Sequence, residues 1–379
     1  MGKNREIGIL RGVAICAVVA IHTFSIATTN VTTGAASWAY QFFHNLIQFA
    51  VPCFIFISSV LLSYPLKNNQ LDVKSFYLKK IYRIVIPYLL WTLFYLVLKV
   101  VTGQLAVSEL FQWKNWVFWI TLGKSYTHLY YMSIILQLYL LAPLLLKVVK
   151  GIQNLFKKYD FIAVVVISIV LEVSIYLLNK KVIYQHFKYH STLMIWYIYL
   201  ILIGIWVGFN YERFKAGLKR HISLIWILFG INMIIYIGYV VLKVKQVSFN
   251  TMWYQFNWFA YAMFAILVVF WICLKVTEKN IENPLIHWIE LLGDYSFGIY
   301  LMHPVITWIL RKLIHVTQPF LLLVILVVAY ILMMLTCIGI IKILRMNKWT
   351  NIIIGEYTLW KKDKDIHKDI NKGIHKSSI

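Results

Sequence analysis

The sequence predicts an all-α, polytopic integral membrane protein with about ten transmembrane helices and both termini in the cytoplasm. Of its 379 residues, 61% are hydrophobic, which is more than one water-soluble core can bury. Apolar stretches that approach the roughly 20 residues needed to span a bilayer recur along the chain. Two of them are FIAVVVISIVLEVSIYLL (161–178) and FLLLVILVVAYILMMLTCIGII (320–341). We therefore expect no separate soluble domain between the spans.

Hydropathy along the chain places the helices in order. The predicted spans are 7–27, 41–64, 81–101, 127–147, 160–178, 193–210, 222–242, 257–275, 285–310 and 319–341. Together they form a transmembrane domain over residues 1–345, and a basic cytoplasmic tail follows at 346–379. Between the third and fourth spans, Trp113, Trp116 and Trp119 recur every three residues, which indicates an interfacial helix or a re-entrant segment.

The basic residues set the orientation. With the N-terminus inside, most of the 37 Lys and Arg residues fall in inner segments, which is the asymmetry of a multi-pass plasma-membrane protein. The net charge of +23 is then explained by topology and contact with the lipid bilayer, so no nucleic-acid partner is expected. One outer loop, 179–190, is basic against the trend, through contact with an anionic partner or as a chance exception.

The four cysteines lie in apolar segments without paired spacing. We therefore expect neither a disulfide framework nor a metal site, and interpret the cysteines as packing residues.

The first span contains an unusual pair of ionisable residues. In RGVAICAVVAIH, Arg11 and His22 are eleven residues apart, which places them within about 20° of one helix face and about 16 Å apart along the axis. A charged side chain inside a membrane helix costs a few kcal/mol unless it has a partner or a polar cavity. Arg11 could instead extend to lipid phosphate, and His22 could be a hydrogen-bonded packing residue. Their shared face favours a functional site.

From these residues onward, the sequence resembles the acyltransferase 3 family of membrane O-acyltransferases. The first helix of that family carries an Arg and a His separated by ten residues, and four further segments match in the same order. They are VPCFIFISSVLLSY (51–64), KKIYRIVIPYLLW (79–91), HLYYMSIILQLYLLAPLL (128–145) and YSFGIYLMHPV (295–305). Within the family, 51–58 and 208–220 look most like the branch containing the intercellular adhesion protein C.

The resemblance implies transfer of an acetyl or succinyl group from cytoplasmic acyl-CoA to a hydroxyl of a cell-envelope or extracellular polysaccharide. Arg11, Lys79, Lys80 and Arg83 are the residues expected to meet the CoA phosphates, although the last three could also be ordinary anchors of the inner face. The family motif usually has two arginines where this chain has Lys80 and Arg83, and a lysine lacks the bidentate guanidinium.

The histidines are the expected chemical groups. His22 is predicted to act as the general base on the acceptor hydroxyl, or to carry the acyl group covalently. His128, Glu172, Tyr300 and His303 are candidates for the acceptor site. Three of them have a structural alternative: an interfacial position for His128, an ion pair for Glu172, and packing at a helix kink for His303 beside Pro304.

Two rival functions remain open at this point. A polysaccharide exporter or flippase would also suit a large cavity edged by cations. A structural partner that holds a polysaccharide synthase in the membrane has no evident use for the shared face of Arg11 and His22. Polysaccharide-synthesis machinery is therefore a candidate partner in either case. The family resemblance and a composition rich in Lys and Ile indicate a bacterial source.

Overall fold

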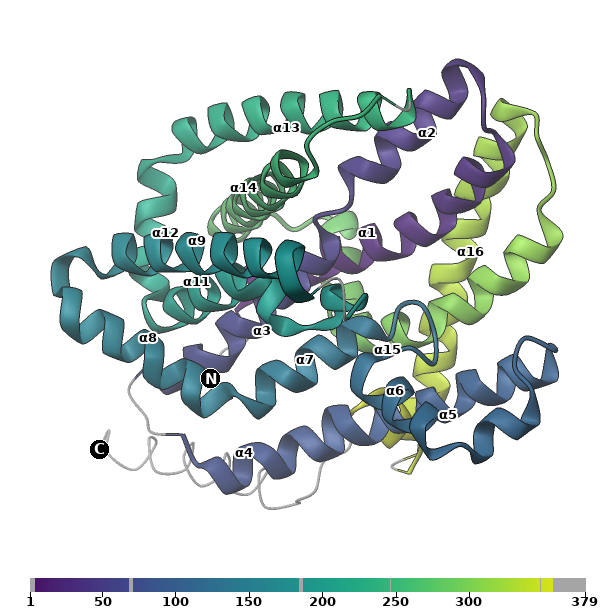
Figure 1. Cartoon of the computed structure of the whole chain (residues 1–379), viewed down its shortest axis with the longest axis horizontal. Coiled ribbons are helices and arrows are strands. Elements are labelled where there is room, and N and C mark those ends of the chain that lie inside the picture. The colour runs from purple at the N-terminus through teal and green to yellow at the C-terminus, as the bar shows by residue number, and fades with distance from the viewer. Residues whose placement is uncertain (1–3, 68–70, 184–186, 246, 348, 357–379) are drawn as a thin grey trace.

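The computed structural model describes residues 4–67, 71–183, 187–245, 247–347 and 349–356, and no strand occurs among them (Figure 1). The α-helices are α1 (Arg5–Asn30), α2 (Gly34–Leu46), α3 (Ala50–Ser63), α4 (Val73–Lys80), α5 (Ile86–Val101), α6 (Trp113–Leu122), α7 (Tyr130–Leu140), α8 (Ala142–Phe156), α9 (Asp160–Leu178), α11 (Ile198–Phe209), α12 (Tyr211–Arg220), α13 (Ile222–Val244), α14 (Thr251–Glu278), α15 (Pro284–Leu313) and α16 (Pro319–Arg345). Short 3-10 segments lie at Tyr64–Leu66, Val107–Phe111, Lys157–Tyr159, His190–Thr192, Met194–Tyr197 and Thr350–Ile354, and π-helical turns at Ile81–Val85 and Asn179–Ile183.

The all-α membrane architecture predicted from the sequence is confirmed. In the described part of the chain, seven helical stretches are long and apolar enough to cross a bilayer, and a bent pair, Met194–Phe209 with Tyr211–Arg220, makes an eighth. Helix α15 is long but carries polar side chains within its length, and it is not among the seven. The predicted number of ten spans and the cytoplasmic position of both termini stay predictions.

Local sequence explains where two predicted spans begin and end. The predicted span 127–147 is divided into α7 and α8, because Pro143 near the start of α8 has no backbone N–H to continue the preceding helix. At Lys157 the backbone takes a φ of 44°, and α8 packs against the following α9. The tryptophan-rich segment forms helix α6, which ends at Gly123 with a φ of 63°.

Glycines allow α1 and α15 to pack backbone to backbone. A Cβ atom at Gly12 would lie 2.0 Å from the Ile289 carbonyl oxygen, and one at Gly293 would lie 2.1 Å from the Gly8 carbonyl oxygen. Side chains along the two helices then pair in order. Arg11 pairs with Ser296, His22 with His303, and Asn30 with the carbonyl of Ile314. The helices are therefore parallel, and their register is fixed by the glycine contacts.

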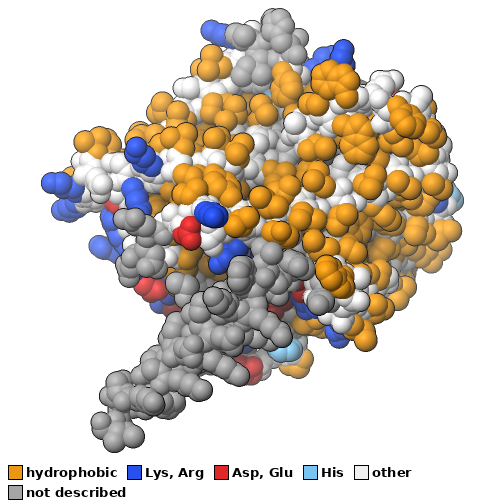
Figure 2. All heavy atoms as spheres, turned by 90° about the horizontal axis from the view of Figure 1, so that it is seen from below, with side chains coloured by type: hydrophobic (Ala, Val, Ile, Leu, Met, Phe, Trp, Pro, Cys, Tyr) orange, Lys and Arg blue, Asp and Glu red, His pale blue; other side chains and the backbone are white. Residues whose placement is uncertain are grey.

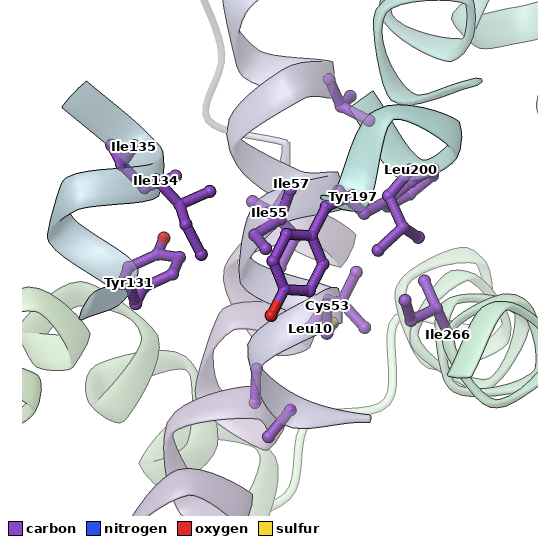
Figure 3. Packing of buried hydrophobic residues seen from close by; sticks show 14 of the residues in the cluster. Leu10, Cys53, Ile55, Ile57, Tyr131, Ile134, Ile135, Tyr197, Leu200 and Ile266 are labelled. Carbon is purple, nitrogen blue, oxygen red and sulfur yellow. The ribbon is translucent and has the colours of Figure 1, made fainter. Parts of the chain in front are cut away.

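A second close pair, α3 and α11, forms the other half of the core. Gly204 and Gly208 lie against α3, where Ser63 Oγ donates to the Ile205 carbonyl at 2.8 Å. Figure 3 shows side chains from α1, α3, α7, α11 and α14 meeting at this core, with Tyr197 projecting among them. Small residues that admit close backbone approach are typical of helix interfaces in membranes.

Residues 349–356 pack on the helices instead of extending away from them. Trp91 Nε1 donates to the Ile353 carbonyl at 3.0 Å, Ile354 is buried, and Arg345 forms an ion pair with Glu356. The rest of the predicted tail, 357–379, lies outside the described residues.

The outer surface of the bundle is largely apolar. Hydrophobic side chains cover most of the face in Figure 2, and Lys and Arg side chains gather mainly along its left edge. Exposed leucines, isoleucines and valines on α5, α9, α13 and α16 supply much of the apolar surface of the molecule. Such a surface is suited to lipid rather than water.

Candidate functional site

Helices α1 and α15 assemble the centre of the site. On the side predicted to be inner, Arg11 Nη2 donates to Ser296 Oγ at 2.9 Å. Three turns further along α1, the rings of His22 and His303 lie 5.0 Å apart between their centroids. The two residues that the sequence places on one face of the first helix thus both meet α15.

Three histidine rings converge in the predicted outer half of the bundle. The ring of His128 lies 5.6 Å from that of His303, in an edge-on arrangement. Tyr300 packs its ring 5.1 Å from His128 and donates its hydroxyl to the His128 carbonyl. His128 and His303 are buried and His22 is partly exposed. The structure therefore brings together four of the predicted site residues, which come from three separate segments of the chain.

Three ring nitrogens of His128 and His303 are free to bind a substrate. His303 Nδ1–H donates to the Ile299 carbonyl at 3.0 Å, so in the neutral ring Nε2 carries the lone pair. Within the described residues, His303 Nε2 and both ring nitrogens of His128 are buried and have no hydrogen-bond partner. Buried polar atoms of native proteins are rarely left unsatisfied. A group that binds here and donates or accepts hydrogen bonds would satisfy them.

Of the four basic residues predicted to bind CoA, the structure places two near each other and leaves the other two on the surface. Arg11 interacts electrostatically with Asp294 and Tyr139, and Lys80 Nζ lies 3.6 Å from the centroid of the Tyr139 ring. Arg11 and Lys80 therefore share one aromatic neighbour. Lys79 and Arg83, by contrast, have exposed side chains, which the structure does not bring to Arg11.

Glu172 lies apart from the histidine cluster. It is buried on α9 and lines a cavity of about 970 Å³ bounded by α9 and α11 to α14. Most of the other lining side chains are apolar, among them Phe256 and Met263. The structure thus places Glu172 in a second, mainly apolar cavity rather than beside His128 or His303.

Three residues of the site were not singled out from the sequence. Ser296, the partner of Arg11, is the serine of the matched segment 295–305, so the motif itself contained the signal. His44 interacts electrostatically with His22 and lies beside the carbonyl of Ile21. Arg311 also interacts electrostatically with His22, and donates to Ser25 at 2.5 Å.

His44 belongs to a polar stripe. Gln41, His44, Asn45 and Gln48 recur at helical spacing in an otherwise apolar segment. That stripe was the available signal for a second polar region beside α1. For Arg311, at the end of a predicted span, no comparable signal exists.

No group of three or more His, Cys, Asp or Glu side chains in the described part of the chain is arranged to hold a metal ion. All four cysteines are free thiols.

The fold and the buried histidine cluster define a multi-pass membrane protein with a polar site inside its helix bundle. Comparison with known families specifies the class further. The model of the acyltransferase 3 family, described as an acyltransferase domain, matches residues 4–342. The chain therefore belongs to this family, which confirms the resemblance inferred from the motifs.

Curated relatives are bacterial. A protein of Staphylococcus aureus (strain MRSA252) is 24% identical over 362 residues, which are 93% of this chain and 95% of the relative. A Staphylococcus epidermidis protein is 24% identical over 369 residues, or 94% and 96% of the two chains. Both are named probable poly-beta-1,6-N-acetyl-D-glucosamine export protein. No solved structure matches the chain significantly. The protein is thus a multi-pass bacterial membrane protein of the acyltransferase 3 family.

Proposed function

We propose that this protein transfers an acetyl or succinyl group from cytoplasmic acyl-CoA to a hydroxyl of a cell-envelope or extracellular polysaccharide. The observation that carries the proposal is the convergence of His22, His128 and His303 in a membrane bundle, with unpartnered ring nitrogens on His128 and His303. The names of the relatives support an N-acetylglucosamine polymer as the glycan. Acyl-CoA is a substrate here, and no resident cofactor is required.

Arg11 and Lys80 fit the donor end of the reaction. A guanidinium and an ammonium that share Tyr139 as a neighbour supply the charge that the phosphates of CoA require. Ser296 orients Arg11 through its hydrogen bond. The helical rise from Arg11 to His22, about 16 Å, is comparable with the reach of an extended pantetheine arm. The parallel contact of α1 and α15 would hold the two ends of the donor in register.

The histidine cluster supplies the proton transfer. In the proposed step, His22 takes the proton of an acceptor hydroxyl while the hydroxyl oxygen attacks the thioester carbonyl carbon. The new C–O ester bond forms, the C–S bond breaks with its electron pair on sulfur, and the thiolate takes the proton from His22. General-base catalysis of this kind contributes about 10² to 10⁴ in rate. His128 and His303 border the acceptor, and Tyr300 fixes the backbone at His128.

The test uses membranes that contain the wild-type protein or His22→Ala, with radiolabelled acetyl-CoA and succinyl-CoA supplied separately. We expect label in the glycan with release of free CoA, and a loss of at least 100-fold in the variant. His287→Ala is a matched control, because His287 lies on α15 before the matched motif, outside the cluster. Wild-type labelling by His22→Ala at equal protein level would refute the assigned role.

The names of the relatives favour a second candidate, export of the polysaccharide. An exporter needs no acyl-CoA. If the protein is an exporter, a strain that lacks it would retain unacylated glycan inside the cell. Glycan that reaches the surface without its acyl groups in that strain would favour acyl transfer. A third candidate is a purely structural role beside a synthase. In that case both Arg11 and His22 are dispensable for the location of the glycan and for its acylation.

A further inference from the structure

Another cavity, of about 690 Å³ and distinct from the one that Glu172 lines, lies between α1, α2, α13, α14 and the segment before α11. We propose that this cavity binds the sugar chain that receives the acyl group, and that it selects uncharged N-acetylated sugars over sugars with a free amine. The binding of a sugar chain is inferred from the cavity itself. That the chain is the acyl acceptor rests on the proposed function.

The lining combines aromatic rings with amides, the chemistry that recognises carbohydrate. Trp196, Trp258 and Tyr254 contribute rings, and Gln41, Gln48 and Gln255 contribute side-chain amides. Aromatic faces pack against the C–H surface of a sugar ring, and an amide both donates and accepts the hydrogen bonds of hydroxyl and acetamido groups. The cavity that contains Glu172 has a mainly apolar lining, so the two cavities suit different ligands.

The amides of the lining are partly occupied in an ordered network. Tyr236 Oη donates to Asn45 Oδ1 at 3.3 Å, and the Gln48 amide lies 3.0 Å from His44 Nε2. Asn45 itself donates to the Gln41 carbonyl. These bonds hold the polar stripe at the end of α2 in place. Its side chains therefore lose little conformational freedom when a ligand binds.

The cavity adjoins the histidine cluster. Thr28 of α1 is part of its lining, and so is His44, which interacts electrostatically with His22. The lining residues of α1, α2, α13 and α14 come from the ends that the predicted topology places outside. A glycan that enters from the outer face would therefore reach His22 from the side opposite to Arg11.

The charge of the lining favours an uncharged ligand. Lys243 is part of the wall and is exposed. The described lining residues include no Asp or Glu. A protonated glucosamine amine would meet a like charge and no carboxylate, whereas an acetamido group would meet amides and rings. Specificity of this kind arises from repulsion of the wrong ligand as much as from attraction of the right one.

The experiment measures binding without acyl-CoA. Purified full-length protein in lipid nanodiscs is titrated by calorimetry with an oligosaccharide of N-acetylglucosamine, and separately with a glucosamine oligosaccharide of the same length and linkage. We expect the N-acetylated chain to bind at least tenfold more tightly. Trp258→Ala should raise its Kd about tenfold or more. Trp253→Ala is the matched control, because Trp253 is 61% exposed on the same helix and outside this cavity.

A charge reversal tests the selectivity without disturbing the core. Lys243→Glu changes an exposed side chain, so the fold should be retained. We expect it to tighten binding of the glucosamine oligosaccharide about tenfold and to leave the N-acetylated chain within twofold. Equal binding of both sugars by wild type, unchanged in Lys243→Glu, would overturn the selectivity.

The two proposals fail in different ways. Trp258-dependent binding by a protein that transfers no acyl group would support the glycan site and refute acyl transfer. Acyl transfer by a protein whose sugar binding is absent, or is unchanged in Trp258→Ala, would refute the glycan site.

Discussion

Substitution of Gly12 by alanine tests whether the register of α1 against α15 builds the site. The added Cβ would lie 2.0 Å from the Ile289 carbonyl oxygen, and real Cβ contacts essentially never fall below 3.0 Å. The helices must therefore move apart locally by about 1 Å, the difference between these two distances. The Arg11–Ser296 hydrogen bond, now 2.9 Å long, would then exceed hydrogen-bonding distance.

The expected magnitude follows from that displacement. A shift of about 1 Å in a positioned group costs about 100-fold in rate, and overpacking costs about 1 to 3 kcal/mol in stability. We expect Gly12→Ala to lower the rate of acyl transfer by about two orders of magnitude, measured as CoA release. Its melting temperature in detergent should also fall.

Gly8→Ala is the control for this substitution. Gly8 lies four residues away on α1, and a Cβ there meets nothing within 4 Å. Alanine is favoured over glycine in a helix by about 1 kcal/mol, so this variant should keep its activity and its melting temperature or raise the latter. If Gly12→Ala transfers acyl groups and melts as the wild type does, the close packing of α1 on α15 does not set the site.

Three further outcomes are expected. Ser296→Ala should raise the KM for acyl-CoA about tenfold with a smaller change in kcat, because Arg11 loses its acceptor; an effect on kcat alone would contradict this. Tyr300→Phe removes one hydrogen bond to the His128 carbonyl and should slow acyl transfer about five- to tenfold, and an unchanged rate would refute a role for that bond. Asp160→Ala should lower the free energy of unfolding by about 1 to 3 kcal/mol, since its carboxylate accepts four hydrogen bonds; urea denaturation in detergent checks this.

Much of the architecture was predictable because the signal is local. Apolar length and the positions of Lys and Arg depend only on the sequence near each span, as does the common face of Arg11 and His22. The ordered family motifs also indicated His128 and His303 as site residues, and in the structure their rings do cluster with that of His22.

The partners of these residues were not predictable, because they depend on register between distant helices. Ser296 meets Arg11 only because glycines let α15 approach α1 at one offset. For Glu172, the residue itself was recognised from the sequence but its location was not. Burial of a carboxylate in an apolar span indicated a site, but no local pattern shows which cavity the side chain enters.

The distance in sequence between Arg11 and its acceptor has a consequence for the synthesis of the protein. The two residues are 285 positions apart, so at about 5 to 20 residues per second the ribosome needs about 15 s to 1 min to make Ser296 after Arg11. During that time Arg11, which lies toward the predicted inner end of α1, lacks its partner on α15, and an unpartnered charge within a membrane helix is unfavourable. A chain that stops before α15 never acquires this partner, so its Arg11 stays without the Ser296 hydrogen bond.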